Sequence, residues 1–358
     1  MATAYFSNGA FTISSLHEQQ NKSFFLSDYE KSVLLFLSEW VKGKSNWSSN
    51  TSGSTGTPKT IQLSRDKMEY SAQQTIDYLG LKKGSTGLLA INAAFVGGKM
   101  MMARCLMQEM NLIVRTPAST VLDNLQELPK IDFAAFVPLQ IYHFLQHTSI
   151  KNTFQSIEHI LIGGAPLSPT AAEVISNMPN HCWQTYGMTE TYSHVALKGL
   201  SRGCKTDHFS AVGDAVFSVD EANRLIINGS ITDHQPLQTN DVVKLLDERH
   251  FEWVGRFDHI INTGGIKVSP EALESKIFQG CANAFQQQAF FLSSLPDDRL
   301  GEKIVLYVEG NGDRSSLQSA LSQVLDKYEM PKEIIFKERF VYTLTGKINR
   351  IASVKQDS

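Results

Sequence analysis

The sequence has few cysteines and no strong charge of either sign. Its cysteines are Cys105, Cys182, Cys204 and Cys281, and none of them form a CxxC pair. This spacing argues against a zinc site or a dithiol redox centre, and for free thiols in a reducing compartment. The formal net charge is -3 over 358 residues, so no basic face is expected for nucleic acid or for an anionic membrane.

The sequence also lacks a long uninterrupted hydrophobic run. Its most apolar stretch, 87–114, is interrupted by Asn92, Lys99, Arg104 and Glu109, whereas a membrane span needs about 20 apolar residues. The opening MATAYFSNGAFTISS shows no basic start followed by an apolar run, so a signal peptide is not predicted. We expect no membrane insertion and a cytoplasmic protein.

The length suffices for one large domain and one smaller domain. Short apolar runs alternate with helical patterns up to about residue 209, which predicts an α/β fold with a largely parallel sheet. Short strands joined by turns follow, and then a compact α+β segment. We predict a large N-terminal α/β domain over 1–257 and a smaller, mobile C-terminal α+β domain over 258–358.

The elements expected along the chain are mostly short. A helix should begin with a capping box at Asp66 and Glu69 and end before Gly80. The other helices are expected over 99–108, 270–278 and 315–327. The strands are expected over 60–63, 88–94, 133–137, 159–162, 225–228, 242–246, 251–254, 289–292 and 304–308.

The segment TSGSTGTPK at 51–59 has the composition of a phosphate-binding loop. Glycine lets backbone N–H groups turn toward an anion, hydroxyls donate further hydrogen bonds, and Lys59 adds a positive charge. It is not a Walker A loop, because Pro58 stands where that motif has glycine. A flexible Ser/Gly linker is the alternative, but the Pro-Lys end and the strand expected after it favour phosphate binding.

Three further motifs are weaker when taken singly. YGMTET at 186–191 places a carboxylate in a hydroxyl-rich turn, which suits Mg²⁺ beside phosphate oxygens or, alternatively, a capped helix start. GRFDHIINTGGIKV at 255–268 suits a nucleotide contact and a hinge, or a hairpin with a surface ion pair. TGKINR at 345–350 offers a lysine that either reaches an anion or stays in solvent.

The occurrence of all four motifs together, in this order, is far more specific than any one of them. Together they resemble the signatures of the acyl-adenylate-forming superfamily, which contains acyl- and aryl-CoA ligases, nonribosomal peptide adenylation domains and luciferases. The resemblance extends over 51–350, most of the chain. It implies an enzyme that uses ATP and Mg²⁺ to convert a carboxylic acid into its adenylate and then passes the acyl group to a thiol, such as that of coenzyme A.

The resemblance assigns most of the nucleotide site to the first domain. The glycine-rich loop would bind the ATP phosphates through Thr51, Ser52, Gly53, Ser54, Thr55, Gly56 and Lys59. The adenine would be bordered by Gly164, Ala165, Pro166, Tyr186 and Gly187. Thr189 would contact the α-phosphate as a catalytic residue, and Glu190 would be both a catalytic residue and the Mg²⁺ ligand.

The remaining assignments concern the ribose and the mobile domain. The ribose would be bound by Arg256 and by Asp241, although Asn240 departs from the superfamily's T-G-D motif. Asp258 matches the hinge, and Lys347 matches the catalytic lysine that stabilises charge around the α-phosphate. After a rotation of the small domain, the channel for coenzyme A would be faced by Gly264, Gly265 and Lys267.

Two departures from the superfamily bear on the substrate. Phe95 stands where many relatives carry a histidine or an aromatic residue, and only 50 residues precede the phosphate loop. The short N-terminal part, GGAPL at 163–167 and TYGMTETYSH at 185–194 are similar to a compact subgroup, the o-succinylbenzoate–CoA ligases of menaquinone biosynthesis. A missing or minimal subdomain leaves a surface that a homodimer would cover.

The acid of that subgroup has an aromatic ring and a second carboxylate, which requires a polar or cationic partner. We expect an apolar wall from Phe95 and the nearby methionines, and polar contacts from Lys99, Ser193 and His194. The alternatives are that Lys99 and Arg104 are solvated and that His194 is a hydrogen-bonded core residue.

Two other functions stay open at this point. An enzyme that activates another aryl or acyl acid, or that loads a carrier-protein thiol, would share all four motifs. A protein that binds a nucleotide without catalysis belongs to a different class, and it would need neither Glu190 nor Lys347. The presence of both residues argues against that class.

Overall fold

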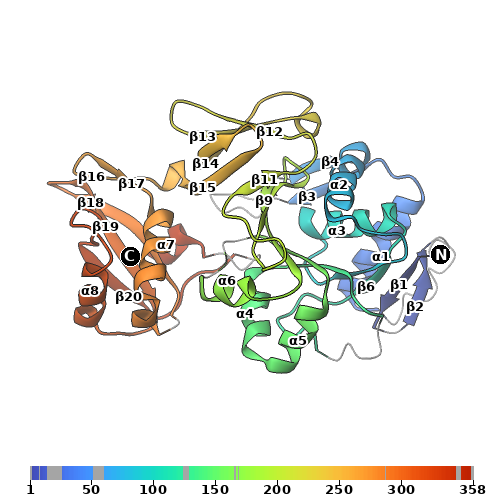
Figure 1. Ribbon diagram of the computed structural model, residues 1–358, viewed down its shortest axis with the longest axis horizontal. Coiled ribbons are helices and arrows are strands. Elements are labelled where there is room, and N and C mark those ends of the chain that lie inside the picture. The colour runs from blue at the N-terminus through green and yellow to red at the C-terminus, as the bar shows by residue number, and fades with distance from the viewer. Residues whose placement is uncertain are drawn as a thin grey trace. The chain divides into compact units, whose positions relative to one another are not determined.

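The structure is a computed structural model that describes residues 2–7, 9–13, 26–50, 60–123, 129–164, 167, 169–286, 288–343 and 348–355. Contacts divide the chain into two compact units (Figure 1). The first unit comprises Met1–Val216 and Asn228–Gln235, and the second comprises Phe217–Ile227 and Pro236–Ser358. The second unit therefore begins before the boundary predicted at Asp258. One reason is that Gly255 lies against Ser269, whose Oγ is 2.3 Å from the position of a Cβ at residue 255.

The first unit is built on a mixed sheet with the strand order β11-β10-β9-β8-β7-β5-β6-β1-β2. Its strands are β1 (Thr3–Phe6), β2 (Gly9–Thr12), β5 (Thr86–Leu89), β6 (Asn111–Val114), β7 (Phe133–Phe136), β8 (His159–Ile162), β9 (His181–Met188), β10 (Ser193–Gly199) and β11 (Phe209–Ala211). From β9 through to β1 the neighbours are parallel, and the pairs at both edges are antiparallel. The predicted α/β class is confirmed.

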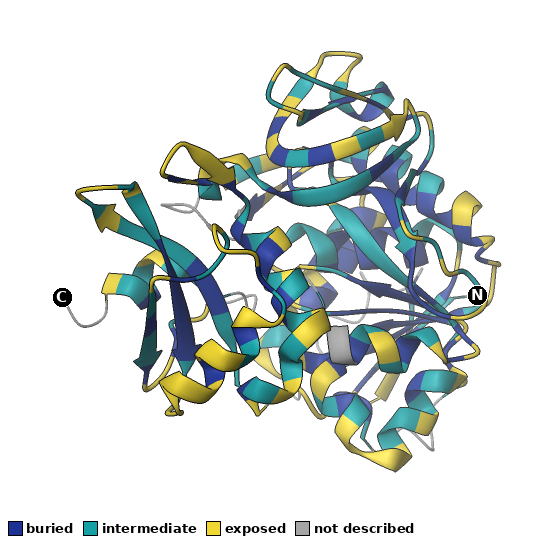
Figure 2. Ribbon diagram, turned by 60° about the vertical axis from the view of Figure 1, so that its left-hand side comes forward, coloured by how far each residue is buried: buried dark blue, intermediate teal, exposed yellow. Residues whose placement is uncertain are grey.

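Helices cover both faces of this sheet, because successive residues of a buried strand point to opposite sides. Leu88 and Ile160 belong to one hydrophobic core, and the next residues, Leu89 and Leu161, belong to the other. The core of Leu89 is covered by α1 (Asp28–Val41), α2 (Arg65–Leu79) and α3 (Val96–Met107). The core of Leu88 is covered by α4 (Pro138–Gln146), α5 (Thr148–Ser156) and α6 (Pro169–Ser176). Figure 2 shows the buried residues along the strands between these helices.

A separate antiparallel pair flanks the phosphate-loop segment. It consists of β3 (Asn46–Asn50) and β4 (Thr60–Ser64), and Asn50 lies opposite Thr60. The loop at 51–59 lies outside the described residues, but this pairing places its two neighbours side by side. The strand predicted at 60–63 is confirmed by β4.

The helix after β4 ends as predicted but starts differently. Gly80 is its C-cap with φ +64°, a left-handed conformation that favours glycine. The predicted capping box is wrong, because α2 begins at Arg65 with Ser64 as its N-cap. Asp66 therefore lies inside the first turn, and the carboxylate of Glu69 pairs with Nε of Arg65 at 2.7 Å.

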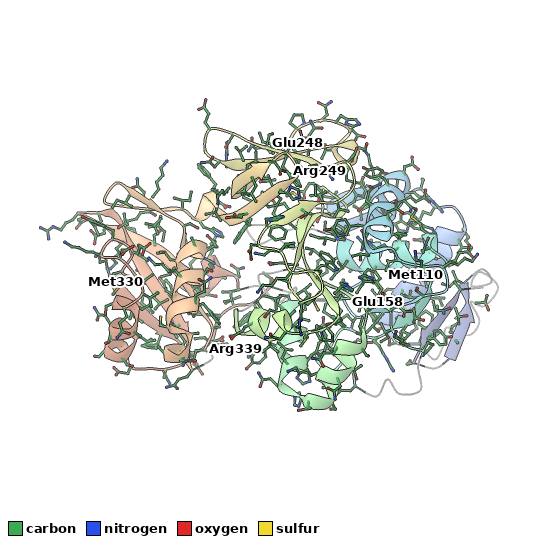
Figure 3. The ribbon with its side chains drawn as sticks, in the orientation of Figure 1. Met110, Glu158, Glu248, Arg249, Met330 and Arg339 are labelled. Carbon is green, nitrogen blue, oxygen red and sulfur yellow. The ribbon has the colours of Figure 1, made fainter. Side chains whose placement is uncertain are left out.

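The second unit contains two sheets. The strands β12 (Val216–Val219), β13 (Arg224–Asn228), β14 (Leu237–Asp247) and β15 (His250–Arg256) follow one another in the first sheet. Figure 3 labels Glu248 and Arg249 in the turn that joins β14 to β15. The second sheet has the order β17-β16-β19-β18, with β20 beside β19. Its strands are β16 (Ile261–Thr263), β17 (Ile266–Val268), β18 (Phe290–Asp297), β19 (Gly301–Glu309) and β20 (Glu333–Lys337).

Helices α7 (Pro270–Cys281) and α8 (Arg314–Ser322) pack on the second sheet around Ile277, Leu306 and Leu321. A smaller cluster around Phe291 and Tyr307 receives Val354 from α9 (Arg350–Lys355). The part of the second unit that follows Phe257 is thus α+β, as predicted for 258–358.

Most predicted elements are present with different ends. The run 88–94 is β5 over Thr86–Leu89, because the chain leaves the sheet at Ala90 and turns toward α3. Helix α3 begins at Val96 rather than at residue 99, and α8 ends at Ser322 rather than at residue 327. Within the described ranges, no helix is long and apolar enough to cross a membrane.

Candidate active site

The candidate site lies at the carboxyl ends of neighbouring parallel strands, where open α/β sheets bind their ligands. Gly163 and Gly164 directly follow β8, and Tyr186 lies near the end of β9. Gly164 has φ +90°, and a Cβ at residue 163 would lie 2.3 Å from Oγ1 of Thr185. Glycine therefore lets the chain leave β8 close to β9, and a contact of Gly164 with adenine stays a prediction.

The YGMTET motif is a β-hairpin, so the helix start that the sequence allowed here is wrong. Strand β9 carries the motif's first residues, 189–192 form the turn, and β10 begins at Ser193. Gly187 lies opposite His194, and a Cβ at residue 187 would lie 1.9 Å from the carbonyl oxygen of Ser193. Thr191 stabilises the turn: its hydroxyl accepts from the N–H of Met188 at 2.9 Å and donates to the carbonyl of Ser193 at 2.7 Å.

The turn buries Thr189 and exposes Glu190. Mg²⁺ keeps several waters and is usually held by one or two carboxylates together with substrate phosphates. In the part of the chain that the structure describes, no group of three His, Cys, Asp or Glu side chains is placed to hold a metal ion. The exposed carboxylate of Glu190 is of the kind that shares Mg²⁺ with substrate phosphates, and its role as the Mg²⁺ ligand stays a prediction.

A buried polar cluster joins α3 to β10, and the sequence did not predict it. Arg104 is 2% exposed, and its Nη2 donates to Oγ of Ser193 at 3.2 Å. Among the described residues, its Nε has no acceptor and no carboxylate pairs with it. Burial lowers the pKa of Arg104 to about 10. A buried cation with a spare donor is unfavourable unless an anion completes the site.

Lys99 is also buried, so the solvated alternative is wrong for Lys99 and for Arg104. The Nζ of Lys99 donates to the carbonyl oxygens of Ala93 at 3.1 Å and Ala94 at 2.6 Å, and burial lowers its pKa to about 8. These bonds tie α3 to the turn before it, where Phe95 is the N-cap. A contact of Lys99 or Phe95 with substrate stays a prediction.

His194 is 6% exposed, and both of its ring nitrogens have partners. Its Nε2 lies 3.0 Å from Oγ1 of Thr75, and its Nδ1 lies 3.3 Å from Oγ of Ser193. Burial lowers the pKa of His194 well below its ordinary value, and the charge of Arg104 lowers it further. His194 is therefore the hydrogen-bonded core residue that the sequence left open, and a direct contact with substrate stays a prediction.

The ribose candidates are neighbours within the second unit. Asp241 lies opposite Arg256 on β14 and β15, with Oδ1 3.9 Å from Nη1 of the arginine. Trp253 donates from Nε1 to the same carboxylate at 3.2 Å. Arg256 also forms a bidentate pair with Asp258, with both N–O distances at 2.8 Å, and this pair lowers the pKa of Asp258. The nucleotide and hinge roles of these residues stay predictions.

The other candidates of the second unit lie at the β16–β17 turn and in the TGKINR motif. Gly264 and Gly265 have φ +60° and +83°, and Lys267 is exposed on β17. Arg350 begins α9, and its Nη2 lies 2.8 Å from Oε2 of Glu274. Several predicted site residues lie outside the described part of the chain, namely Thr51, Ser52, Gly53, Ser54, Thr55, Gly56, Lys59, Ala165, Pro166 and Lys347. Their roles stay predictions.

Comparisons with known proteins agree with this fold. The profile of the family described as AMP-binding enzyme matches residues 50–227. The solved structure of an acyl-CoA synthetase (AMP-forming)/AMP-acid ligase II-like protein from Dyadobacter fermentans is 31% identical, with a TM-score of 0.65, over 97% of this chain and 99% of that chain. These matches define the class, and the chain belongs to the AMP-binding enzyme family.

Two further relatives are named for the same acid, o-succinylbenzoate. The 2-succinylbenzoate–CoA ligase of Listeria monocytogenes is 26% identical over 346 residues, which cover 90% of this chain and 72% of that protein. The O-succinylbenzoate coenzyme A synthetase of Bacillus subtilis, solved in complex with ATP and magnesium ion, is 19% identical, with a TM-score of 0.73. The match covers 86% of this chain and 69% of the Bacillus subtilis chain. At this identity the structural match shows the shared fold.

Proposed function

We propose that this chain is an ATP-dependent, AMP-forming acid–CoA ligase whose acid is o-succinylbenzoate. The observation that carries the proposal is the buried guanidinium of Arg104 beside Ser193, which closely follows the YGMTE motif. Such a cation, with no carboxylate partner among the described residues, favours an acid with a second carboxylate. The relatives named 2-succinylbenzoate–CoA ligase support the same acid.

The reaction has two steps. A carboxylate oxygen of the acid attacks the α-phosphorus of ATP, and the bond to pyrophosphate breaks. The sulfur of coenzyme A then attacks the acyl carbon, AMP leaves, and the thiol proton passes to solvent. Glu190 would hold Mg²⁺, which offsets phosphate charge when bound, and Lys347 would stabilise charge around the α-phosphate during the first step.

Arg104 suits the second carboxylate better than Lys99, which the sequence favoured. The ammonium of Lys99 already donates to two main-chain carbonyls, whereas Nε of Arg104 has no acceptor among the described residues. A guanidinium also presents a planar set of donors that matches a carboxylate. Methionines 100–102 are fully buried on the same helix, and they give the apolar surroundings that an aromatic acid requires.

The test is acid-dependent ATP–pyrophosphate exchange with o-succinylbenzoate, benzoate and a fatty acid, followed by transfer to coenzyme A or to a phosphopantetheinylated carrier protein. We expect o-succinylbenzoate and coenzyme A to be preferred. If benzoate or the fatty acid is used better, the proposed acid is wrong while the reaction class stands. Nucleotide binding without exchange for any acid would indicate a non-catalytic protein.

Two variants compare the candidate cations. Arg104→Leu should raise KM for o-succinylbenzoate about 10- to 100-fold, the loss of a hydrogen bond to a charged group, with little change in KM for ATP. Lys99→Ala tests the assignment made from the sequence. If Lys99→Ala raises the KM for o-succinylbenzoate more than Arg104→Leu does, Lys99 rather than Arg104 binds the second carboxylate.

A further inference from the structure

A continuous series of hydrogen bonds connects Arg104 to helix α2. Nη2 of Arg104 lies 3.2 Å from Oγ of Ser193, which lies 3.3 Å from Nδ1 of His194. Nε2 of His194 lies 3.0 Å from Oγ1 of Thr75, and that hydroxyl lies 3.3 Å from the carbonyl oxygen of Ser71. All five residues belong to the first unit.

The main-chain carbonyl of Ser71 only accepts, so Thr75 donates to it and accepts from Nε2–H of His194. Because burial keeps the His194 ring neutral, its Nδ1 carries no proton and accepts from Ser193. Oγ of Ser193 accepts from Arg104 and gives its own proton to Nδ1 of His194. A neutral ring with its proton on Nε2 is the form of His194 that satisfies all of these bonds. A protonated ring would leave the Ser193 proton without this acceptor, beside a buried cation.

The hydrogen bonds matter for the orientation of the ring, because the χ2 torsion of a histidine has broad wells and does not fix the ring plane by itself. The bonds to Thr75 and Ser193 therefore set the direction in which its two ring nitrogens point. Changes at either bond should alter the direction in which the Ser193 oxygen points.

We propose that His194 is a positioning residue that acts through Ser193 to hold Arg104 in the orientation that receives the second carboxylate of the acid. This inference rests on the proposed function. Because His194 takes the Ser193 proton, the lone pairs of the serine oxygen stay directed toward Nη2 of Arg104. Nε, the buried atom without an acceptor among the described residues, is then the donor left for the substrate.

The test compares KM and kcat for the acid and for ATP in four enzymes: wild type, His194→Leu, Ser193→Ala and the double variant. Each single change should raise KM for o-succinylbenzoate about 3- to 10-fold, the effect of one hydrogen bond, and leave KM for ATP nearly unchanged. The double variant should be no worse than Ser193→Ala, because His194 acts through that hydroxyl. Multiplied effects, or an equal rise in KM for ATP, would overturn the proposal.

Two further variants separate positioning from a general loss of structure. His194→Asn keeps an oxygen acceptor near the position of Nδ1, so it should recover most of the affinity for the acid. His159→Leu is the matched control, because His159 is a partly buried histidine of the same unit. It lies at the amino end of β8, whereas the candidate site lies at the carboxyl end. His159→Leu should leave KM for the acid unchanged, and thermal melting of every variant checks its folding.

Nitrogen-15 NMR of the histidine rings gives a readout that does not depend on the acid, and the His194→Asn spectrum assigns the signal. We expect a neutral His194 with its proton on Nε2 from pH 6 to 8 in the wild type, and a changed signal in Ser193→Ala and Thr75→Val. A proton on Nδ1 would refute the role of His194 whichever acid is used. A wild-type preference for benzoate with the expected tautomer would refute the proposed acid instead.

Discussion

Gly187 gives a direct test of how closely β9 and β10 approach each other. A Cβ at this position would lie 1.9 Å from the carbonyl oxygen of Ser193 and 2.5 Å from Cα of His194. An ordinary contact begins near 3.4 Å, so Gly187→Ala must move β10 by about 1.5 Å, the difference between 3.4 and 1.9 Å. Both obstructing atoms belong to the backbone, so no side-chain rotation relieves the clash.

The expected cost follows from this displacement. Overpacking a core typically destabilises by about 1–3 kcal/mol and occasionally by more, and each strand-pairing hydrogen bond that is lost adds about 1 kcal/mol. We therefore expect the free energy of unfolding of the first unit to fall by about 3–5 kcal/mol for Gly187→Ala. At about 2–4 °C per kcal/mol for a unit of this size, its melting temperature should fall by about 10 °C.

Thermal melting followed by circular dichroism measures this effect. Gly97→Ala is the matched control, because among the described residues a Cβ at residue 97 would meet only Cδ1 of Ile91, at 3.3 Å. Gly97 lies in α3, where alanine is favoured over glycine by about 1 kcal/mol, so this variant should melt near the wild type or slightly above it. If Gly187→Ala also melts within about 2 °C of the wild type, the close approach of β9 and β10 described above is wrong.

Four other predictions concern the reaction and the second unit. Glu190→Gln should raise the Mg²⁺ concentration needed for half-maximal activity, because an amide is a weaker ligand for a hard cation; an unshifted Mg²⁺ titration would exclude Glu190 as the ligand. Lys347→Ala should slow adenylation about 10²- to 10³-fold with an unchanged melting temperature, and near-normal pyrophosphate exchange would contradict its assigned role. Asp258→Pro should slow thioester formation more than adenylation in single-turnover experiments, relative to Asp258→Ala; equal losses in both steps would make Asp258 structural. Burial raises the pKa of Glu274 from 4.5 to about 7, so its contribution to the free energy of unfolding should fall as pH rises between these values, because the unfolded chain loses the proton first. Glu274→Gln should flatten that pH dependence in denaturant titrations, and parallel curves for the two proteins would refute the shifted pKa.

Local patterns predicted the elements that alternate clearly between apolar and polar segments. The short apolar runs that became β7 and β8 have residues buried on both faces of the sheet, and such runs stand out in a sequence. Strand β9 was missed because the YGMTET motif is rich in glycine and hydroxyl residues, which are typical of turns and helix caps. The glycine is there because the opposite strand approaches too closely for a side chain, and no local pattern reports that distance.

The burial of Arg104 was not predicted, for a related reason. Residues 98–105 of α3 are buried on all sides of the helix, so the sequence shows no polar stripe that would mark a functional position. The hydroxyl that binds Arg104 belongs to Ser193, 89 residues further along the chain. The division into units was also hidden, because most of the strands before Asp258 belong to the second unit, in which Gly255 packs against Ser269, and a sequence pattern does not report that contact.

The pairing of Asn50 with Thr60 has a consequence for how tightly a nucleotide can bind. Joining the two ends of a flexible loop has an entropic cost that rises by only about 0.6 kcal/mol for each doubling of loop length. Here the antiparallel pair already joins the ends as the first unit folds, so this cost does not weaken ATP binding. Adding a residue or two to the loop should change folding stability little. If residues 51–59 bind the phosphates, as the sequence predicts, a large loss of ATP affinity in such insertion variants would measure how closely they must fit them.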